Sequence, residues 1–185
     1  PSPSYQKDED RPADERGVLD EPVPSPGGDR VAVARHVGES GYLEVGPARR
    51  GARRKVVFFS RNGCCANIVW ASRDVVVFIE GYSRDWTVDV RTGRARRIAG
   101  FSGFNLSQDG RWLAGWHDNG PHIAGTVGVI SIHGTDCHVP RRPKGASDSL
   151  AFFSADRKRL SFNRETLDPY RGWTQTVPVS SLRPA

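Results

Sequence analysis

From Val23 onward, short apolar runs alternate with turns rich in Gly, Pro, Asp and Ser. Apolar runs bounded by such turn residues are typical of β-strands. No stretch repeats apolar residues at i, i+3, i+4 and i+7 over three turns, as an amphipathic helix would. After a first strand near Val23, the pattern predicts strands at residues 31–34, 42–45, 55–59, 67–70, 75–79, 86–90, 96–99, 104–106, 112–116, 127–132, 137–139, 150–153, 159–162 and 174–179.

One short phrase is repeated along the chain, and its clearest copy runs from Phe104 to Asp118. It predicts two strands joined at Asp109-Gly110, because Asp-Gly readily adopts the positive φ angles of a two-residue hairpin. Weaker copies surround Ser25, Ser72 and Ser154, and with Ser107 these serines are spaced by 47, 35 and 47 residues. Periods of about 40–45 residues are typical of propeller blades.

Grouped by this repeat, the strands form four units in meander order, and the fourth unit lacks its outermost strand. We therefore predict an all-β fold over residues 23–185, a β-propeller or part of one, built of four-stranded antiparallel blades. An open sheet edge invites another strand. Propellers commonly close when one terminus completes the blade begun at the other.

The repeated phrase resembles the TolB-like, WD-related β-propeller repeat, whose usual core is Trp-Ser-Pro-Asp-Gly-Lys followed by an apolar strand. The resemblance covers about residues 23–180 and implies a propeller, although such propellers usually have more than four blades. A complete ring, half of a dimeric ring and a fragment are all compatible with four units. The matching segments are Leu106-Ser107-Gln108-Asp109-Gly110-Arg111, Phe153-Ser154-Ala155-Asp156-Arg157-Lys158, Ser25-Pro26-Gly27-Gly28-Asp29-Arg30 and Trp70-Ala71-Ser72-Arg73-Asp74.

Residues 1–22 form a proline-rich acidic segment with seven acidic and three basic residues, whereas the whole chain has a net charge of +6. Such a composition predicts an extended arm. We expect Val18-Leu19 or the region around Tyr5 to pair along the open edge of the last unit, or with a neighbouring molecule. Pairing is expected to stop before Pro22 and Pro24, because proline has no N–H to donate.

Arginines gather in the outer turns of the first two units. In a propeller these turns share one face with the turns between the first and second strands, so the face could bind nucleic acid, lipid headgroups or an acidic protein. These turns lack the interleaved aromatic residues of a single-strand binder. A solvated basic rim that contacts the acidic arm is the alternative. The residues concerned are Arg49, Arg50, Arg53 and Arg54 in the first unit and Arg94, Arg96 and Arg97 in the second.

Four of the five histidines fall within the third unit, together with one cysteine. His117, His122, His133 and Cys137 are candidate ligands for zinc or copper, because imidazole and thiolate suit these ions. Their spacing matches no closed zinc module, and Cys137 and His138 would point to opposite faces of one strand. We therefore expect no metal ion and no other cofactor.

The chain has three cysteines, which cannot all pair within one molecule. Adjacent cysteines bridge each other only with strain, so a disulfide, if one forms, is predicted between Cys137 and either Cys64 or Cys65. Three buried thiols are the alternative.

No catalytic motif stands out in the sequence. Without a Gly-x-Ser-x-Gly segment, the chain resembles at most the propeller part of a prolyl-oligopeptidase-type enzyme. We expect a non-catalytic recognition or assembly module that acts through the arm and the open blade edge. An accessory propeller of a hydrolase and a polyanion-binding protein are the alternatives.

No apolar window is long enough to span a bilayer. The chain begins at Pro1 and contains no methionine, so we expect a processed or truncated product. Separately, we expect a recognition module of this kind to lie outside the cytoplasm, either secreted or in the cell envelope.

Overall fold

The computed structural model describes residues 17–81, 84–98, 101–117, 126–134, 136–156, 158–167 and 169–184, without the side chains of residues 101–104, 117 and 167. Most of these residues lie in antiparallel strands, and none of them forms an α-helix. The prediction of an all-β fold is therefore confirmed. No helix within the described ranges has the length and apolar character needed to cross a membrane.

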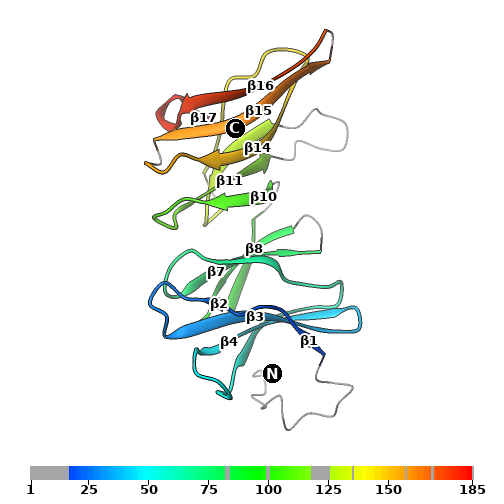
Figure 1. The fold of residues 1–185 in the computed structure, drawn as a ribbon, viewed down its shortest axis with the longest axis vertical. Coiled ribbons are helices and arrows are strands. Elements are labelled where there is room, and N and C mark those ends of the chain that lie inside the picture. Colours follow the sequence, from blue (N-terminus) through cyan, green and yellow to red (C-terminus); the bar gives the residue numbers. More distant parts are fainter. Residues whose placement is uncertain are drawn as a thin grey trace. The chain divides into compact units, whose positions relative to one another are not determined.

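The chain divides into two compact units between Arg97 and Ile98, and each unit contains two sheets (Figure 1). In unit 1 the first sheet has the order β1-β3-β4-β5, with β2 also pairing with β3, and the second has the order β6-β7-β8-β9. The first sheet comprises β1 (Val18–Leu19), β2 (Val23–Pro24), β3 (Arg30–Val37), β4 (Ser40–Pro47) and β5 (Lys55–Ser60). The second comprises β6 (Ala66–Trp70), β7 (Val75–Glu80), β8 (Arg84–Asp89) and β9 (Arg94–Arg97).

Unit 2 contains the third and fourth sheets. The third has the order β10-β11-β12-β13-β17 and the fourth, as predicted, has only three strands, β14-β15-β16. After β16 a short 3₁₀ turn (Val179–Ser181) leads the chain back to β13. The strands are β10 (Phe101–Leu106), β11 (Trp112–His117), β12 (Thr126–Ser131), β13 (Cys137–Val139), β14 (Ala146–Phe153), β15 (Arg159–Leu167), β16 (Tyr170–Pro178) and β17 (Arg183–Pro184).

Each unit has its own hydrophobic core, built from alternate residues of its strands. Successive side chains on a strand point to opposite faces, so residues two apart share a face. In unit 1, Leu43 of the first sheet belongs to one buried cluster with Val76 and Phe78 of the second. In unit 2, Val129 of the third sheet belongs to a buried cluster with Phe162 of the fourth.

The N-terminal segment pairs with the first sheet of its own chain. Val18 lies opposite His36 of β3, so Val18-Leu19 does form a strand, but its partner is β3 and not the last sheet. The prediction that pairing stops before the prolines is wrong, because β2 pairs with β3 through Pro24. The N–H of Ser25 donates to the carbonyl of Arg30, so by alternation the nitrogen of Pro24 points away from β3. Tyr5 lies outside the described residues.

The turn at Asp109-Gly110 connects β10 and β11, but its loop is longer than the two residues predicted. The Ser107 N–H donates to the Trp112 carbonyl at 2.8 Å, which leaves four residues, 108–111, in the loop. The Ser107 hydroxyl donates to the Asp109 carboxylate at 2.6 Å and accepts the Trp112 N–H at 2.9 Å. Gly110 takes a φ of 69°, which a side chain would disfavour. The two hydrogen bonds of the Ser107 hydroxyl therefore explain why a serine stands in the repeated motif. They also explain why the loop has four residues and not the predicted two.

The same serine geometry recurs at the matching turns of two other sheets. The hydroxyl of Ser25 donates to Asp29 and accepts the Arg30 N–H, and the hydroxyl of Ser154 donates to Asp156 and accepts the Arg159 N–H. Ser72 departs from the pattern, since its hydroxyl accepts the Asp74 N–H across a shorter turn.

The disulfide prediction needs a correction. The structure joins Cys64 to Cys65 and leaves Cys137 as a free thiol. The paired cysteines are buried next to each other in the turn between β5 and β6, whereas Cys137 lies on β13 of the other unit. Burial raises the pKa of the Cys137 thiol to about 11.

Candidate functional site

Four turns of unit 1 lie at the same end of its two sheets. In the first sheet, the Ala48 N–H donates to the Asp29 carbonyl at 3.0 Å, which joins the β2–β3 and β4–β5 turns. In the second, the Val90 N–H donates to the Asp74 carbonyl at 2.9 Å, which joins the β6–β7 and β8–β9 turns. Antiparallel strands bring alternate turns to one edge, so this arrangement follows from the meander order.

Ion pairs connect the turns of the two sheets. Arg30 contacts the Asp74 carboxylate at 2.9 Å, and Arg73 contacts the Asp29 carboxylate at 3.0 Å. We call this region the arginine end of unit 1. It comprises Arg30, Arg49, Arg50, Arg53, Arg54, Arg73, Arg91 and Arg94.

The carboxylates of the arginine end are engaged in local contacts. The hydrogen bond from Arg73 is the largest influence that lowers the pKa of Asp29. Asp89 accepts the N–H groups of Arg91 and Thr92 at 3.0 and 2.9 Å, and the Thr92 bond chiefly lowers its pKa. These acids therefore stay ionised and fix the turns, which leaves the surplus arginines to set the charge of this end.

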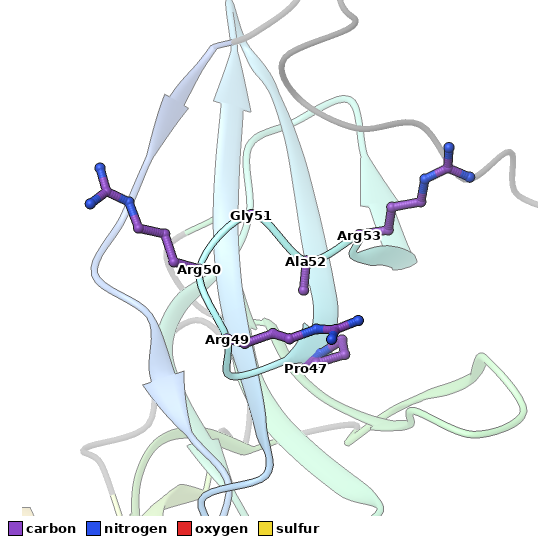
Figure 2. A pocket seen from close by; sticks show the side chains of 6 residues that line it. All are labelled: Pro47, Arg49, Arg50, Gly51, Ala52 and Arg53. Carbon is purple, nitrogen blue, oxygen red and sulfur yellow. The ribbon is translucent and has the colours of Figure 1, made fainter.

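The β4–β5 loop presents three exposed arginines around an open hollow of about 530 Å³ (Figure 2). Arg50 and Arg53 extend to opposite sides of the loop, and Arg49 runs alongside Pro47 (Figure 2). Across the part of the chain that the structure describes, no carboxylate forms an ion pair with these three side chains. Because the guanidinium groups diverge, they suit several separated anionic groups better than one small anion.

The other predicted arginines lie on or beside the same region. Arg94 begins β9 at the turn, and Arg96 and Arg97 follow it along the exposed strand. Arg54 is half-buried and makes an interaction of its own. The structure thus brings the loop arginines and Arg94 to one end, and places Arg96 and Arg97 progressively farther from it.

The histidine group is only partly described. His133 is exposed in the turn after β12, and Cys137 is half-buried on β13. His138 packs its ring on Trp112, with centroids 5.9 Å apart. His122 and the side chain of His117 lie outside the described residues. Within the described ranges, no three His, Cys, Asp or Glu side chains are arranged to hold a metal ion.

Four buried charged groups were not found from the sequence: two ion pairs, Glu80 and Asp85. Glu80 accepts hydrogen bonds from Ser60 and Trp86. Arg35 pairs with Glu44 at 2.7 Å, and Arg164 holds Asp148 through two hydrogen bonds of 2.6 and 2.9 Å. Both arginines stand two residues from a core residue, Val33 and Phe162, so the strand period would have placed them inside.

Asp85 is the fourth such group, and it is fully buried. Neither carboxylate oxygen has a hydrogen-bond partner in the described structure, and burial raises its pKa to about 7. The polar residues around it in the sequence gave no signal of burial.

No family model and no curated protein matches the sequence. Solved structures do match in fold. TolB from Acinetobacter baumannii has 15% identity and a TM-score of 0.57, over 91% of this chain and 43% of that one. A puromycin-hydrolyzing peptidase from Mycobacterium tuberculosis has 16% identity and a TM-score of 0.63, over 90% and 28%. The β-propeller domain of the Trilobed protease from Pyrococcus furiosus, described as having an open velcro topology, has 10% identity and a TM-score of 0.50, over 90% and 56%.

The predicted TolB-like β-propeller fold is therefore confirmed, and the open sheets fit part of a propeller. The chain spans less than two thirds of each of these proteins. At such low identity the likeness concerns the fold alone.

Proposed function

We propose that this chain is a non-catalytic recognition module, and that the arginine end of unit 1 binds an acidic segment of a partner protein. The observation that carries the proposal is the β4–β5 loop, where Arg49, Arg50 and Arg53 are exposed without a carboxylate partner among the described residues. Neighbouring acids are held in the turns, so added carboxylates would meet a surface of net positive charge.

An acidic polypeptide fits this surface better than a nucleic acid does. The four turns contain no aromatic residue on which a base could stack. The guanidinium groups in Figure 2 point apart, which suits carboxylates spaced along a peptide.

The chain's own acidic arm is a poorer candidate for the partner. Its first described strand enters unit 1 opposite His36, near the far end of β3 from Arg30. At about 3.3 Å per residue, these positions are roughly 20 Å apart along the strand. At that end the first described carboxylate of the arm, Asp20, contacts His36 at 3.2 Å, which favours a separate partner for the arginines.

A fluorescent oligoglutamate peptide is the probe for this proposal. The variant R49Q/R50Q/R53Q should bind it about tenfold more weakly than the unchanged chain, since each exposed charge contact contributes a fraction of a kcal/mol to about 1 kcal/mol. The matched control R141Q/K144Q/R183Q removes the same charge from exposed positions of unit 2. This control should change the affinity less than threefold, because the charges it removes are not part of the arginine end. Added salt should weaken binding of the unchanged chain, because it screens exposed charges.

Equal losses in the two variants would show that only net charge matters and would refute a defined surface. Tighter binding of single-stranded DNA than of oligoglutamate would identify nucleic acid as the partner class instead. A location outside the cytoplasm, secreted or in the cell envelope, belongs to the same proposal. Fractionation of source cells with an antibody against this chain tests it.

A second candidate is an accessory propeller of a peptidase, which the likeness to two proteases supports. Immunoblotting of source cells distinguishes it. A product near 20.4 kDa favours a separate recognition module, and a much larger product favours the accessory domain.

A further inference from the structure

The outer edge of β16 is an open sheet edge. The fourth sheet ends at this nine-residue strand, and no described residue pairs with its outer side. In Figure 1, β16 lies at the margin of unit 2, with β15 between it and β14. Tyr170 is 68% exposed and Trp173 is 43% exposed. A long exposed strand of this kind is a template for another strand.

The outermost strands of the other three sheets carry protective features that β16 lacks. β13 is covered by β17, and β9 carries three arginines among its four residues. β5 begins with Lys55, and its pairing with β4 is interrupted by a register shift. β16 has a single charged residue, Arg171, pairs with β15 without a shift, and has its proline at the last position. Charges, bulges and covering strands are the usual means of blocking edge pairing.

The direction of the free backbone groups in β16 follows from one hydrogen bond. The Val179 N–H donates to the Lys158 carbonyl at 2.8 Å, which continues the ladder one residue beyond Pro178. Bonding direction alternates along an antiparallel strand, so Val177, Gln175 and Trp173 bond inward to β15. The N–H and C=O groups of the residues between them therefore face outward. The outward set with N–H groups is Tyr170, Gly172, Thr174 and Thr176.

We propose that this edge pairs with β16 of a second copy of the chain, antiparallel across a two-fold axis. In the register we infer, Tyr170 lies opposite Thr176 and Gly172 opposite Thr174. This register uses every outward N–H from Tyr170 to Thr176 and leaves Pro178 outside the ladder. Trp173 then lies opposite its own counterpart, as aromatic residues do in favourable cross-strand pairs.

The charges of β16 favour a second copy as the occupant. Arg171 is the strand's one charged residue, and the register sets it opposite Gln175. No like charges meet across the axis, although identical strands are paired. The strand is also rich in Tyr, Trp, Thr and Val, which favour β-pairing.

Analytical ultracentrifugation over a range of micromolar concentrations tests the dimer. The mass should rise from 20.4 kDa toward twice that value as concentration increases. Thr174→Pro should stay monomeric at every concentration, because it removes an outward N–H and leaves the backbone bonds to β15 intact. It also removes the hydroxyl that donates to Asn163 of β15 at 3.2 Å, as the control below removes the hydroxyl of Thr176 that contacts Ser161 at 2.9 Å. Thr176→Val is the matched control, since it keeps the backbone donor and should dimerise like the unchanged chain.

A monomer at every concentration would overturn the proposal and leave the edge to a strand of another protein. Dimerisation of a folded Thr174→Pro variant, with its near-UV circular dichroism retained, would overturn it equally.

Cysteine cross-linking tests the register and does not depend on the proline variant. In a Cys137→Ser background, Trp173→Cys should form a disulfide-linked dimer under mild oxidation. Directly opposite residues that are not hydrogen-bonded have Cα atoms about 4.5 Å apart, within disulfide range. Gln175→Cys should not cross-link, because it faces residue 171 of the other copy. Cross-linking at 175 in preference to 173 would refute the proposed pairing.

Discussion

At the scale of single residues, the buried charged side chains differ in whether they have a partner. Arg164 and Asp148 satisfy each other through two short hydrogen bonds, whereas Asp85 is buried without a partner among the described residues. An ionised carboxylate in such a place lacks the hydration it has in the unfolded chain, so burial favours its protonated form. The two cases differ, because the Asp148 carboxylate has a charged partner and the Asp85 carboxylate has none among the described residues.

We expect Asp85 to make the protein less stable as the pH rises. Burial raises its pKa to about 7 in the folded chain, from the ordinary value of 3.8 for this carboxyl. The protonated form is therefore favoured by folding, and its stabilisation is complete below about pH 4 and lost as the pH rises through 7. A pKa difference of this size lowers the free energy of unfolding by on the order of 4 kcal/mol between the low and the high pH limit. Urea unfolding between pH 4 and pH 8 measures it.

Asp85→Asn should remove most of this pH dependence, because the amide carries no charge at any of these pH values. Asp136→Asn, at an exposed carboxylate, is the control and should leave the pH dependence unchanged. An equal slope in Asp85→Asn and the unchanged chain would show that Asp85 is ionised throughout.

Gly41 is the second residue with a sharp expected effect. A Cβ at this position on β4 would lie 2.9 Å from the Cα of Cys64 and closer still to its backbone N and O. Gly41→Ala should therefore lower the free energy of unfolding by about 1–3 kcal/mol, the usual cost of overpacking. Gly172→Ala is the control, because its nearest neighbour is a Glu165 side-chain atom at 3.8 Å. Equal urea midpoints for the two variants would contradict the close approach.

At the scale of elements, the serine turn is the repeated unit. Ser107 is buried and its hydroxyl both donates and accepts, whereas Ser72 only accepts one N–H at 3.3 Å. Ser107→Ala should cost about 1–3 kcal/mol of unfolding free energy, because it leaves the partly buried N–H of Trp112 without its acceptor. Ser72→Ala should cost less than half of that. Chemical denaturation of the two variants decides the order, and a larger loss at Ser72 would contradict this account.

Strands with an apolar core side were predictable from the sequence, and polar strand ends were not. The strand at Cys137–Val139 has the predicted bounds. β16 was predicted from residue 174 but begins at Tyr170, because Arg171 and Gly172 are exposed and give no apolar signal. β17 is two exposed residues that bond through the backbone alone, so no side-chain pattern could reveal it.

The candidate site was predictable in its composition and only partly in its geometry. The arginine-rich turns were visible in the sequence, and meander order brings them to one end of unit 1. The divergence of Arg50 and Arg53 depends on the loop conformation, which the sequence pattern does not define. Asp85 was missed because its burial depends on long-range packing.

At the scale of the whole molecule, each unit contains a core of its own. Phe78 is fully buried in unit 1 and Phe162 is fully buried in unit 2. Phe78→Ala should cost about 3–5 kcal/mol locally and weaken amide hydrogen-exchange protection mainly in residues 30–97. Phe162→Ala is the matched counterpart and should act mainly on residues 112–184. Simultaneous loss of protection in both units from either change would show that the chain unfolds as one cooperative body.

The return of the chain from β16 to β13 has a consequence for protein synthesis. β13 acquires its outer neighbour only when Arg183 and Pro184 pair with it, more than forty residues after β13 itself has been made. At about 5–20 residues per second, a ribosome needs roughly 2–9 s to add residues 140–184. Throughout that interval the edge of β13 on the nascent chain is uncovered, while every strand of unit 1 has already been synthesised. A chaperone that shields strand edges would therefore have the edge of β13 to cover until synthesis of the chain is complete.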